Sequence, residues 1–260
     1  LQIFINHGEK GFHLKNSGRW IEELKDPILS IATADLNRDG GDDLILLIAE
    51  SSGRVVTQIL FNNKKGYFYA RDKEGYFPLR PGIDKVISVD LDQDGDRDLF
   101  YFGQKVQNEN GKISNHQTRI LINKGAGKLE DLTALLLPGL PAGIQDTSFA
   151  DYDGDGVMDI FLIYGNGQNR LLMNNGVGKF TDRTASYLPP ILDNSLHADW
   201  ADFDGDGDND LLVVNRAIGA PYRAFPGEIS YFLENTGGGH FKKRSHKMLP
   251  HLPSYKVYLL

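Results

Sequence analysis

Four nine-residue segments place oxygen-bearing side chains at positions 1, 3, 5 and 9 and a glycine at position 6. They are Asp35–Asp43, Asp90–Asp98, Asp151–Asp159 and Asp202–Asp210. The glycine permits the positive φ of a sharp turn, and the alternate side chains of such a loop converge on one point. Carboxylates held this close repel one another unless a cation neutralises them. Oxygen ligands without His or Cys favour a hard ion, and a flexible loop favours calcium over magnesium.

These segments differ from the EF-hand, which also opens with acids at positions 1, 3 and 5. An EF-hand ends on a bidentate Glu at position 12 and lies between two helices. Position 12 here is Leu46, Tyr101, Leu162 or Val213, and an apolar, strand-like run follows position 9. The pattern therefore predicts a calcium loop between two strands; the alternative is an acidic surface turn without metal.

The predicted ligands are the side chains at positions 1, 3, 5 and 9 and the carbonyl of position 7. The first loop is expected to bind most weakly, because Asn37 replaces an acid and Gly40-Gly41 adds backbone freedom. The full set, acids at position 7 included, is Asp35, Asn37, Asp39, Gly41, Asp43, Asp90, Asp92, Asp94, Asp96, Asp98, Asp151, Asp153, Asp155, Val157, Asp159, Asp202, Asp204, Asp206, Asp208 and Asp210.

The charge of the chain is divided between these loops and the rest. The formal net charge is −7, but the four loops hold 18 of the 35 acids, so the remainder carries an excess of bases. A basic cluster at 242–247 is expected to be a solvated edge strand, and nucleic acid is not an expected partner. Cysteine is absent, which excludes disulfide and thiolate chemistry. No apolar run is long enough for a membrane span.

A second element recurs out of phase with the loops: an apolar strand ending in Asn, a glycine turn, and an aromatic or apolar residue. It occurs five times, beginning at Gln2, Ile59, Leu121, Leu172 and Phe232. Each full repeat therefore contains four short strands. In the third repeat we expect them at 147–151, 160–164, 170–174 and 179–184. The second strand of each repeat is a continuous apolar run, typical of a strand buried on both faces.

Four-stranded units of 50 to 60 residues indicate an all-β fold, a β-propeller of four-stranded blades. Full blades are expected at 23–74, 75–134, 135–186 and 187–248. Residues 1–22 would form a partial blade, and 249–260 the first strand of another. A five-bladed ring could close by combining these ends, but we favour part of a longer chain with further blades.

The acidic nonamers, the Asp-Ile or Asp-Leu that opens the second strand, and the Asn…Gly…Phe turn resemble the FG-GAP/VCBS repeat family, which includes the integrin α propeller. The resemblance covers essentially the whole chain. It implies one calcium loop between the first two strands of each blade, with the metal ligands given above. Integrin-type ligand binding is not implied, because the Phe-Gly and Gly-Ala-Pro signatures do not recur; Gly219-Ala-Pro221 occurs once.

We therefore expect a calcium-stabilised binding module that recognises protein or glycan, in a secreted, periplasmic or cell-surface protein. The expected ligand face is opposite the calcium loops, on long insertions at 104–116 and 215–228 that include Arg216, Tyr222 and Arg223. His197 is expected to line a central channel or pack, because no catalytic constellation stands out. A polysaccharide lyase or hydrolase and a structural spacer remain the alternatives.

Overall fold

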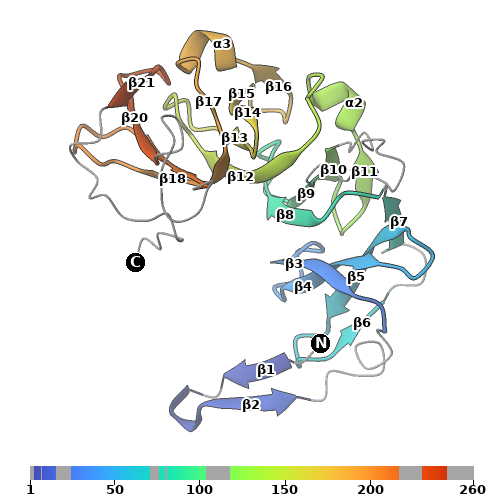
Figure 1. Ribbon diagram of the computed structural model, residues 1–260. Helices are drawn as coiled ribbons and strands as arrows, with labels where there is room; N and C mark the ends of the chain where they lie inside the picture. The colour runs from blue at the N-terminus through green and yellow to red at the C-terminus, as the bar shows by residue number, and fades with distance from the viewer. Residues whose placement is uncertain are drawn as a thin grey trace, which may run out of the picture. The chain divides into compact units, whose positions relative to one another are not determined.

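The computed structural model describes residues 3–6, 8–15, 25–70, 76–79, 81–103, 118–216 and 230–244 (Figure 1). Antiparallel strands dominate these residues, as predicted for an all-β chain. The helices among them are single turns: η1 (Gly8–Lys10), α2 (Thr133–Leu136) and α3 (Thr184–Tyr187). Within these ranges, none is long and apolar enough to cross a membrane.

Three sheets share one plan, in which four strands follow one another in chain order and each is antiparallel to the next. The sheet of the second repeat comprises β8 (Lys85–Val89), β9 (Asp98–Phe102), β10 (Arg119–Asn123) and β11 (Leu129–Asp131). That of the third comprises β12 (Ile144–Ala150), β13 (Asp159–Tyr164), β15 (Arg170–Asn174) and β16 (Phe180–Asp182). That of the fourth comprises β18 (Ser195–Ala201), β19 (Asp210–Asn215), β20 (Tyr231–Asn235) and β21 (Phe241–Arg244).

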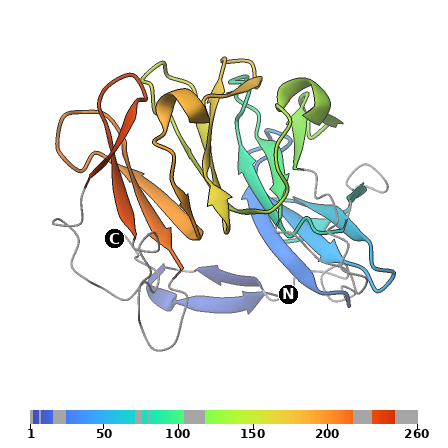
Figure 2. The same cartoon turned by 45° about the horizontal axis from the view of Figure 1, so that its top comes forward.

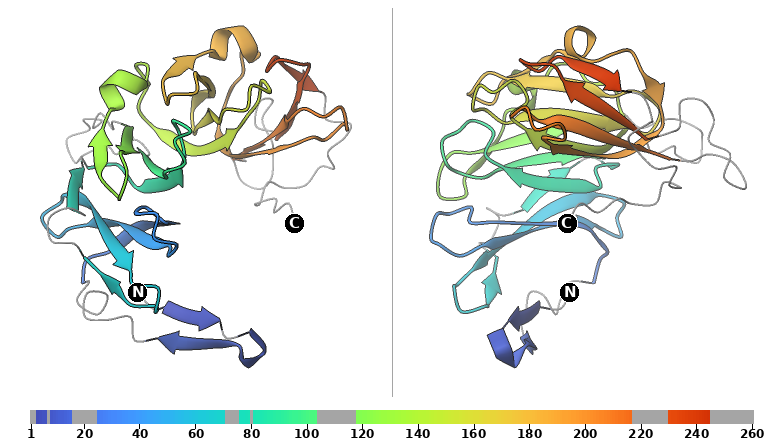
Figure 3. Two further views of the ribbon diagram at one scale, coloured as in Figure 1. Left: turned by 180° about the vertical axis from the view of Figure 1, so that it is seen from behind. Right: turned by 90° about the vertical axis from the view of Figure 1, so that its left-hand side faces the viewer.

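The first repeat has the same four strands and one more. They are β3 (Ile28–Ala34), β4 (Asp43–Ala49), β5 (Val55–Asn62) and β6 (Phe68–Tyr69). β5 is long enough for β6 to pair with its end while β7 (Tyr76–Leu79) pairs with its beginning. Two smaller sheets are β1 (Ile3–Asn6) with β2 (Phe12–Lys15), drawn in dark blue in Figure 3, and β14 (Gly167–Gln168) with β17 (Leu192–Asp193).

The strands predicted for the third repeat are present in the predicted order, with shifted ends. The first begins earlier than predicted, at Ile144, and the fourth ends at Asp182 because α3 begins at Thr184. In the fourth repeat the predicted basic edge strand is β21, drawn in red in Figure 2. Its last three residues are exposed. Residues 245–260, which include the expected last strand, lie outside the described residues.

The second strand of each sheet is its buried centre. All residues of β9, β13 and β19 are buried, as the unbroken apolar runs predicted. The chain divides into two compact units, Leu1–Asp90 with Asp94–Thr133, and Leu91–Gln93 with Ala134–Leu260. Each unit has its own core. Ile45, Phe61, Leu99 and Tyr101 belong to the first core, and Tyr152, Phe161, Leu211, Tyr231 and Phe241 to the second.

Candidate metal-binding loops

The four acidic nonamers each join the first strand of a sheet to the second, and all four close in the same way. In each, the position-1 carboxylate accepts a hydrogen bond from the N–H of the glycine at position 6. The position-5 carboxylate accepts one from the N–H of position 7. The distances for the first bond are 2.7 Å for Gly40 to Asp35, 3.1 Å for Gly95 to Asp90, 2.9 Å for Gly156 to Asp151 and 3.1 Å for Gly207 to Asp202.

Two positions of each loop have left-handed backbone. Position 6 has φ between 85° and 97°, which explains its glycine. Position 4 is left-handed as well, with φ of 55° at Arg38 and 59° at Gln93, and glycine at the other two loops. The repeated backbone brings three of the alternate acidic side chains together in each of the last three loops.

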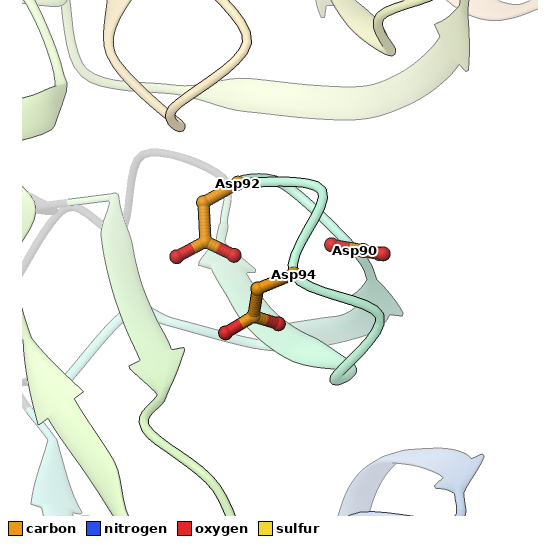
Figure 4. A group of neighbouring side chains, drawn as sticks. All are labelled: Asp90, Asp92 and Asp94. Atoms are coloured by element: carbon orange, nitrogen blue, oxygen red, sulfur yellow. The ribbon is translucent and has the colours of Figure 1, made fainter.

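Three of the loops gather carboxylates closely enough to hold a cation. Within each of three groups the ligand oxygens lie within 4.8 Å of one another: Asp90, Asp92 and Asp94; Asp151, Asp153 and Asp159; and Asp202, Asp204 and Asp206. Figure 4 shows the first group, in which Asp92 and Asp94 project in the same direction from their loop. The first loop forms no such group within the described part of the chain.

The aspartate at position 9 of each loop also has a structural role, which its spacing in the sequence did not predict. Asp43, Asp98, Asp159 and Asp210 are at most 1% exposed. One oxygen of Asp210 accepts the N–H of Phe203 at position 2 (3.0 Å), and the other accepts the N–H of Asn235 (2.8 Å). Asp43 and Asp159 accept the equivalent pairs. This aspartate therefore joins the loop to the third strand, and Asp159 alone of the four belongs to a carboxylate group in the described residues.

Burial and mutual repulsion disfavour the ionised state of several loop acids. Burial, with repulsion from Asp153 and Asp155, raises the pKa of Asp159 to about 7. Burial and the neighbouring loop acids raise the pKa of Asp208 to about 6. Asp90 Oδ1 and Asp208 Oδ1 are buried atoms with no hydrogen-bond donor among the described residues. Buried oxygen acceptors are rarely left unpaired in proteins, and a bound cation would satisfy them. The carboxylate oxygens of these loops therefore fit a hard divalent ion.

Arg38 connects the first loop to the second. Its Nη2 donates to the carbonyl of Asp94 (2.6 Å), and its Nε lies 2.5 Å from Oδ1 of Asp96. Asp96 is the extra acid at position 7 of the second loop, and the guanidinium group neutralises it. Gln93, at the same position of the second loop, donates to the carbonyl of Gly156 in the third (2.7 Å). The left-handed position 4 thus directs a long side chain to the following loop.

The asparagine that ends the third strand also links successive repeats. Nδ2 of Asn123 donates to the carbonyl of Leu36, that of Asn174 to Leu91, and that of Asn235 to Tyr152, each at 2.8 Å. Every acceptor is position 2 of the preceding acidic loop. The same Nδ2 also donates to position 8 of its own loop. The sequence showed this Asn as a recurrent strand end but gave no signal for its partner.

The remaining predicted residues are only partly described. Arg216 follows β19, and its N–H donates to the carbonyl of Asn194 (2.7 Å). Tyr222 and Arg223, and the insertion at 104–116, lie outside the described residues. His197 lies on β18, with Nδ1 2.7 Å from Asp146 and Nε2 3.2 Å from Asp199. The hydrogen bond and ion pair with Asp146 raise the pKa of His197 above its ordinary value.

These features define a β-repeat protein, in which each four-stranded sheet carries an acidic loop and an asparagine that binds the loop before it. The family model described as FG-GAP-like repeat matches residues 90–162 and 151–213. Residues 90–213 therefore match FG-GAP-like repeats, which confirms the resemblance noted from the sequence for this part of the chain. Each match runs from the start of one acidic loop into the strand that directly follows the next acidic loop, which is the second strand of its sheet. No curated protein matches the sequence.

Proposed function

We propose that the chain is a calcium-stabilised interaction module, and that the second, third and fourth acidic loops hold the calcium ions. The observation that supports this most is the recurrence of three carboxylates within 4.8 Å in each of these loops. No described lysine or arginine forms an ion pair with any member of the carboxylate group of the third loop, Asp151, Asp153 and Asp159. Calcium bound there would keep these acids ionised and would couple metal binding to folding.

The arrangement we propose for the repeats is a β-propeller with blades at 23–74, 75–134, 135–186 and 187–248. The asparagine bonds support it, because each joins the third strand of one four-stranded sheet to the acidic loop of the preceding repeat. Sheets repeated radially in this way leave only short, protected edges. Partial blades at both ends, and further blades in a longer chain, belong to the same proposal.

The proposed activity is recognition of a protein or a glycan, on the side of each sheet away from the acidic loops. Arg216 leads into the insertion expected to carry Tyr222 and Arg223, a mixture of cationic and aromatic side chains suited to binding. We propose an extracytoplasmic location, because millimolar calcium outside cells fills loops of modest affinity.

Thermal unfolding with and without calcium tests the structural part of this proposal. Removal of calcium with EGTA should lower the melting temperature by roughly 5–10 °C, since a ligand that binds only the folded state stabilises it. Magnesium should restore little of the loss, because it demands octahedral geometry and dehydrates reluctantly. A melting curve that EGTA leaves unchanged would contradict calcium binding.

Binding to an array of glycans, and to extracellular matrix proteins, tests the recognition part. The expected ligand should be lost in the double variant Tyr222→Ala/Arg223→Ala and retained in Lys179→Ala, a change on the turn beside the third acidic loop. Retention by the double variant would exclude this face as the recognition site.

A further inference from the structure

The turn after the third strand has a left-handed residue at its second position in all four repeats, but the amino acid at this position differs in the first. This residue, two after the asparagine, is Gly125, Gly176 and Gly237 in the last three repeats and Lys64 in the first. All four have positive φ, between 62° and 99°. In each, the N–H donates to Oδ1 of the asparagine, from Lys64 to Asn62 at 2.8 Å. Lys64 thus occupies a backbone position that L-residues other than Asn and Asp rarely adopt.

The side chain of Lys64 extends over the first acidic loop. Its Nζ lies 3.6 Å from Oδ1 of Asp39, the acid at position 5. A Cβ atom added to Gly40 would lie 3.9 Å from the same nitrogen. The ammonium group is therefore placed at the acidic loop, beside one of the residues predicted as metal ligands.

The loop makes room for this lysine at position 7. Gly41 is buried, and a Cβ added to it would lie 3.1 Å from Cγ of Lys64 and 3.3 Å from Oδ1 of Asp39. The third repeat has the opposite arrangement, with a side chain at position 7 of the loop and glycine in the turn. There Cγ2 of Val157 would lie 3.7 Å from a Cβ added to Gly176. Position 7 of the acidic loop and the second residue of the turn therefore share the same space. Where the loop has a side chain at position 7 the turn has glycine, and where the turn has Lys64 the loop has Gly41.

The charge of the first loop is also reduced. Position 3 is Asn37, which accepts the N–H of Asp39 (3.0 Å) as Asp153 accepts that of Asp155 (3.3 Å). The amide performs the same turn hydrogen bond without a charge. Two changes, Asn37 and Lys64, therefore remove one negative charge and add one positive charge at the same loop.

We infer that the Lys64 ammonium group replaces the metal ion in the first loop, so that this loop is closed by an internal cation and does not bind calcium. The inference rests on the proposal that the other three loops bind calcium. It revises the sequence-based expectation of a weak fourth site. The first repeat would keep its loop structure when calcium is removed, whereas the other three would lose theirs.

Calcium stoichiometry, measured by isothermal titration and native mass spectrometry on the full chain, tests the inference. Wild type should bind three ions, and Asn37→Asp/Lys64→Gly should bind four. The matched variant Asn37→Asp/Lys65→Gly alters the neighbouring lysine of the same turn and should stay at three. A conservative pair locates the sites: Asp39→Asn should leave three ions bound, whereas Asp206→Asn, at the same position of the fourth loop and a member of its carboxylate group, should leave two.

The outcomes distinguish the inferred role of Lys64 from the proposal that the other three loops bind calcium. Four ions in wild type, or loss of one ion in Asp39→Asn, would overturn the role of Lys64 and leave calcium binding intact. No ion bound to any variant would overturn both. A fourth ion that appears in the Lys64 variant and not in its Lys65 counterpart supports the inference.

Discussion

The side-chain amide of Asn235 donates a 2.8 Å hydrogen bond to the backbone carbonyl of Tyr152, 83 residues earlier in the chain. Both residues are at most 1% exposed. The carbonyl belongs to the third acidic loop and the asparagine to the fourth sheet, so one buried amide joins two repeats. Because its backbone N–H also donates to Asp210, Asn235 connects the loop of its own repeat with the loop of the previous one.

Asn235→Asp should therefore lower the free energy of unfolding by about 2 kcal/mol. The carboxylate keeps the acceptor but loses both donated hydrogen bonds, which leaves the Tyr152 carbonyl buried without a donor. Urea denaturation at neutral pH measures the change. Asn62→Asp is the matched control, because Nδ2 of Asn62 donates to Asp42 of its own loop (3.0 Å) and, within the described residues, to no other repeat. Equal costs for the two variants would refute an inter-repeat role.

Two acids of the fourth loop should respond differently to calcium. Asp210→Asn should lower the melting temperature equally with calcium and with EGTA, because one of the two buried N–H groups that it accepts would face an amide N–H₂. Asp204→Asn keeps the acceptor for the N–H of Asp206 and removes a charge. It should lower the melting temperature in calcium and change little in EGTA. Calorimetric scans of both variants under both conditions test this, and a calcium-dependent effect at Asp210 would assign that residue to the metal as well.

Substitutions at position 3 of the first and third loops should reduce stability by different amounts. Asp153→Ala should cost more stability in calcium than Asn37→Ala, because Asp153 belongs to a carboxylate group proposed to hold calcium, whereas Asn37 belongs to the loop in which Lys64 lies beside Asp39. A difference of about 1–2 kcal/mol is expected, since both variants lose the same turn hydrogen bond and Asp153→Ala alone weakens a proposed calcium site. Thermal unfolding in saturating calcium provides the comparison. Equal losses would mean that the two loops have the same role.

Much of this architecture is readable from the sequence because it follows from local rules. The apolar run at 160–164 predicted a buried second strand, and the position-6 glycines predicted left-handed turns; both are confirmed. The bonds between repeats were not predictable, because Asn174 and Leu91 are 83 residues apart. The single-turn helices α2 and α3 are too short to show a helical period.

Lys64 and Arg38 illustrate the same limit for charge. In the sequence, Lys64 is one of two adjacent lysines in a polar turn, and Arg38 is one of two bases within the nonamers. Only the fold shows that Lys64 lies at Asp39 of its own repeat and that Arg38 lies at Asp96 of the next. Sequence spacing therefore located the acidic loops, and the structure was needed to find the cations that the chain itself supplies to them.

His197 should make the stability of the second unit depend on pH. Its ring lies between Asp146 and Asp199, and the pKa of His197 is raised above its ordinary 6.5. The protonated ring thus stabilises the folded state below the unfolded pKa, and the contribution is lost as pH rises through the folded pKa. His197→Gln should cost up to about 1 kcal/mol near pH 5.5 and little near pH 9, because the pair is partly exposed to solvent. An NMR titration of the imidazole should give a pKa above 6.5 that falls in Asp146→Asn; an unshifted pKa in wild type would contradict the pairing.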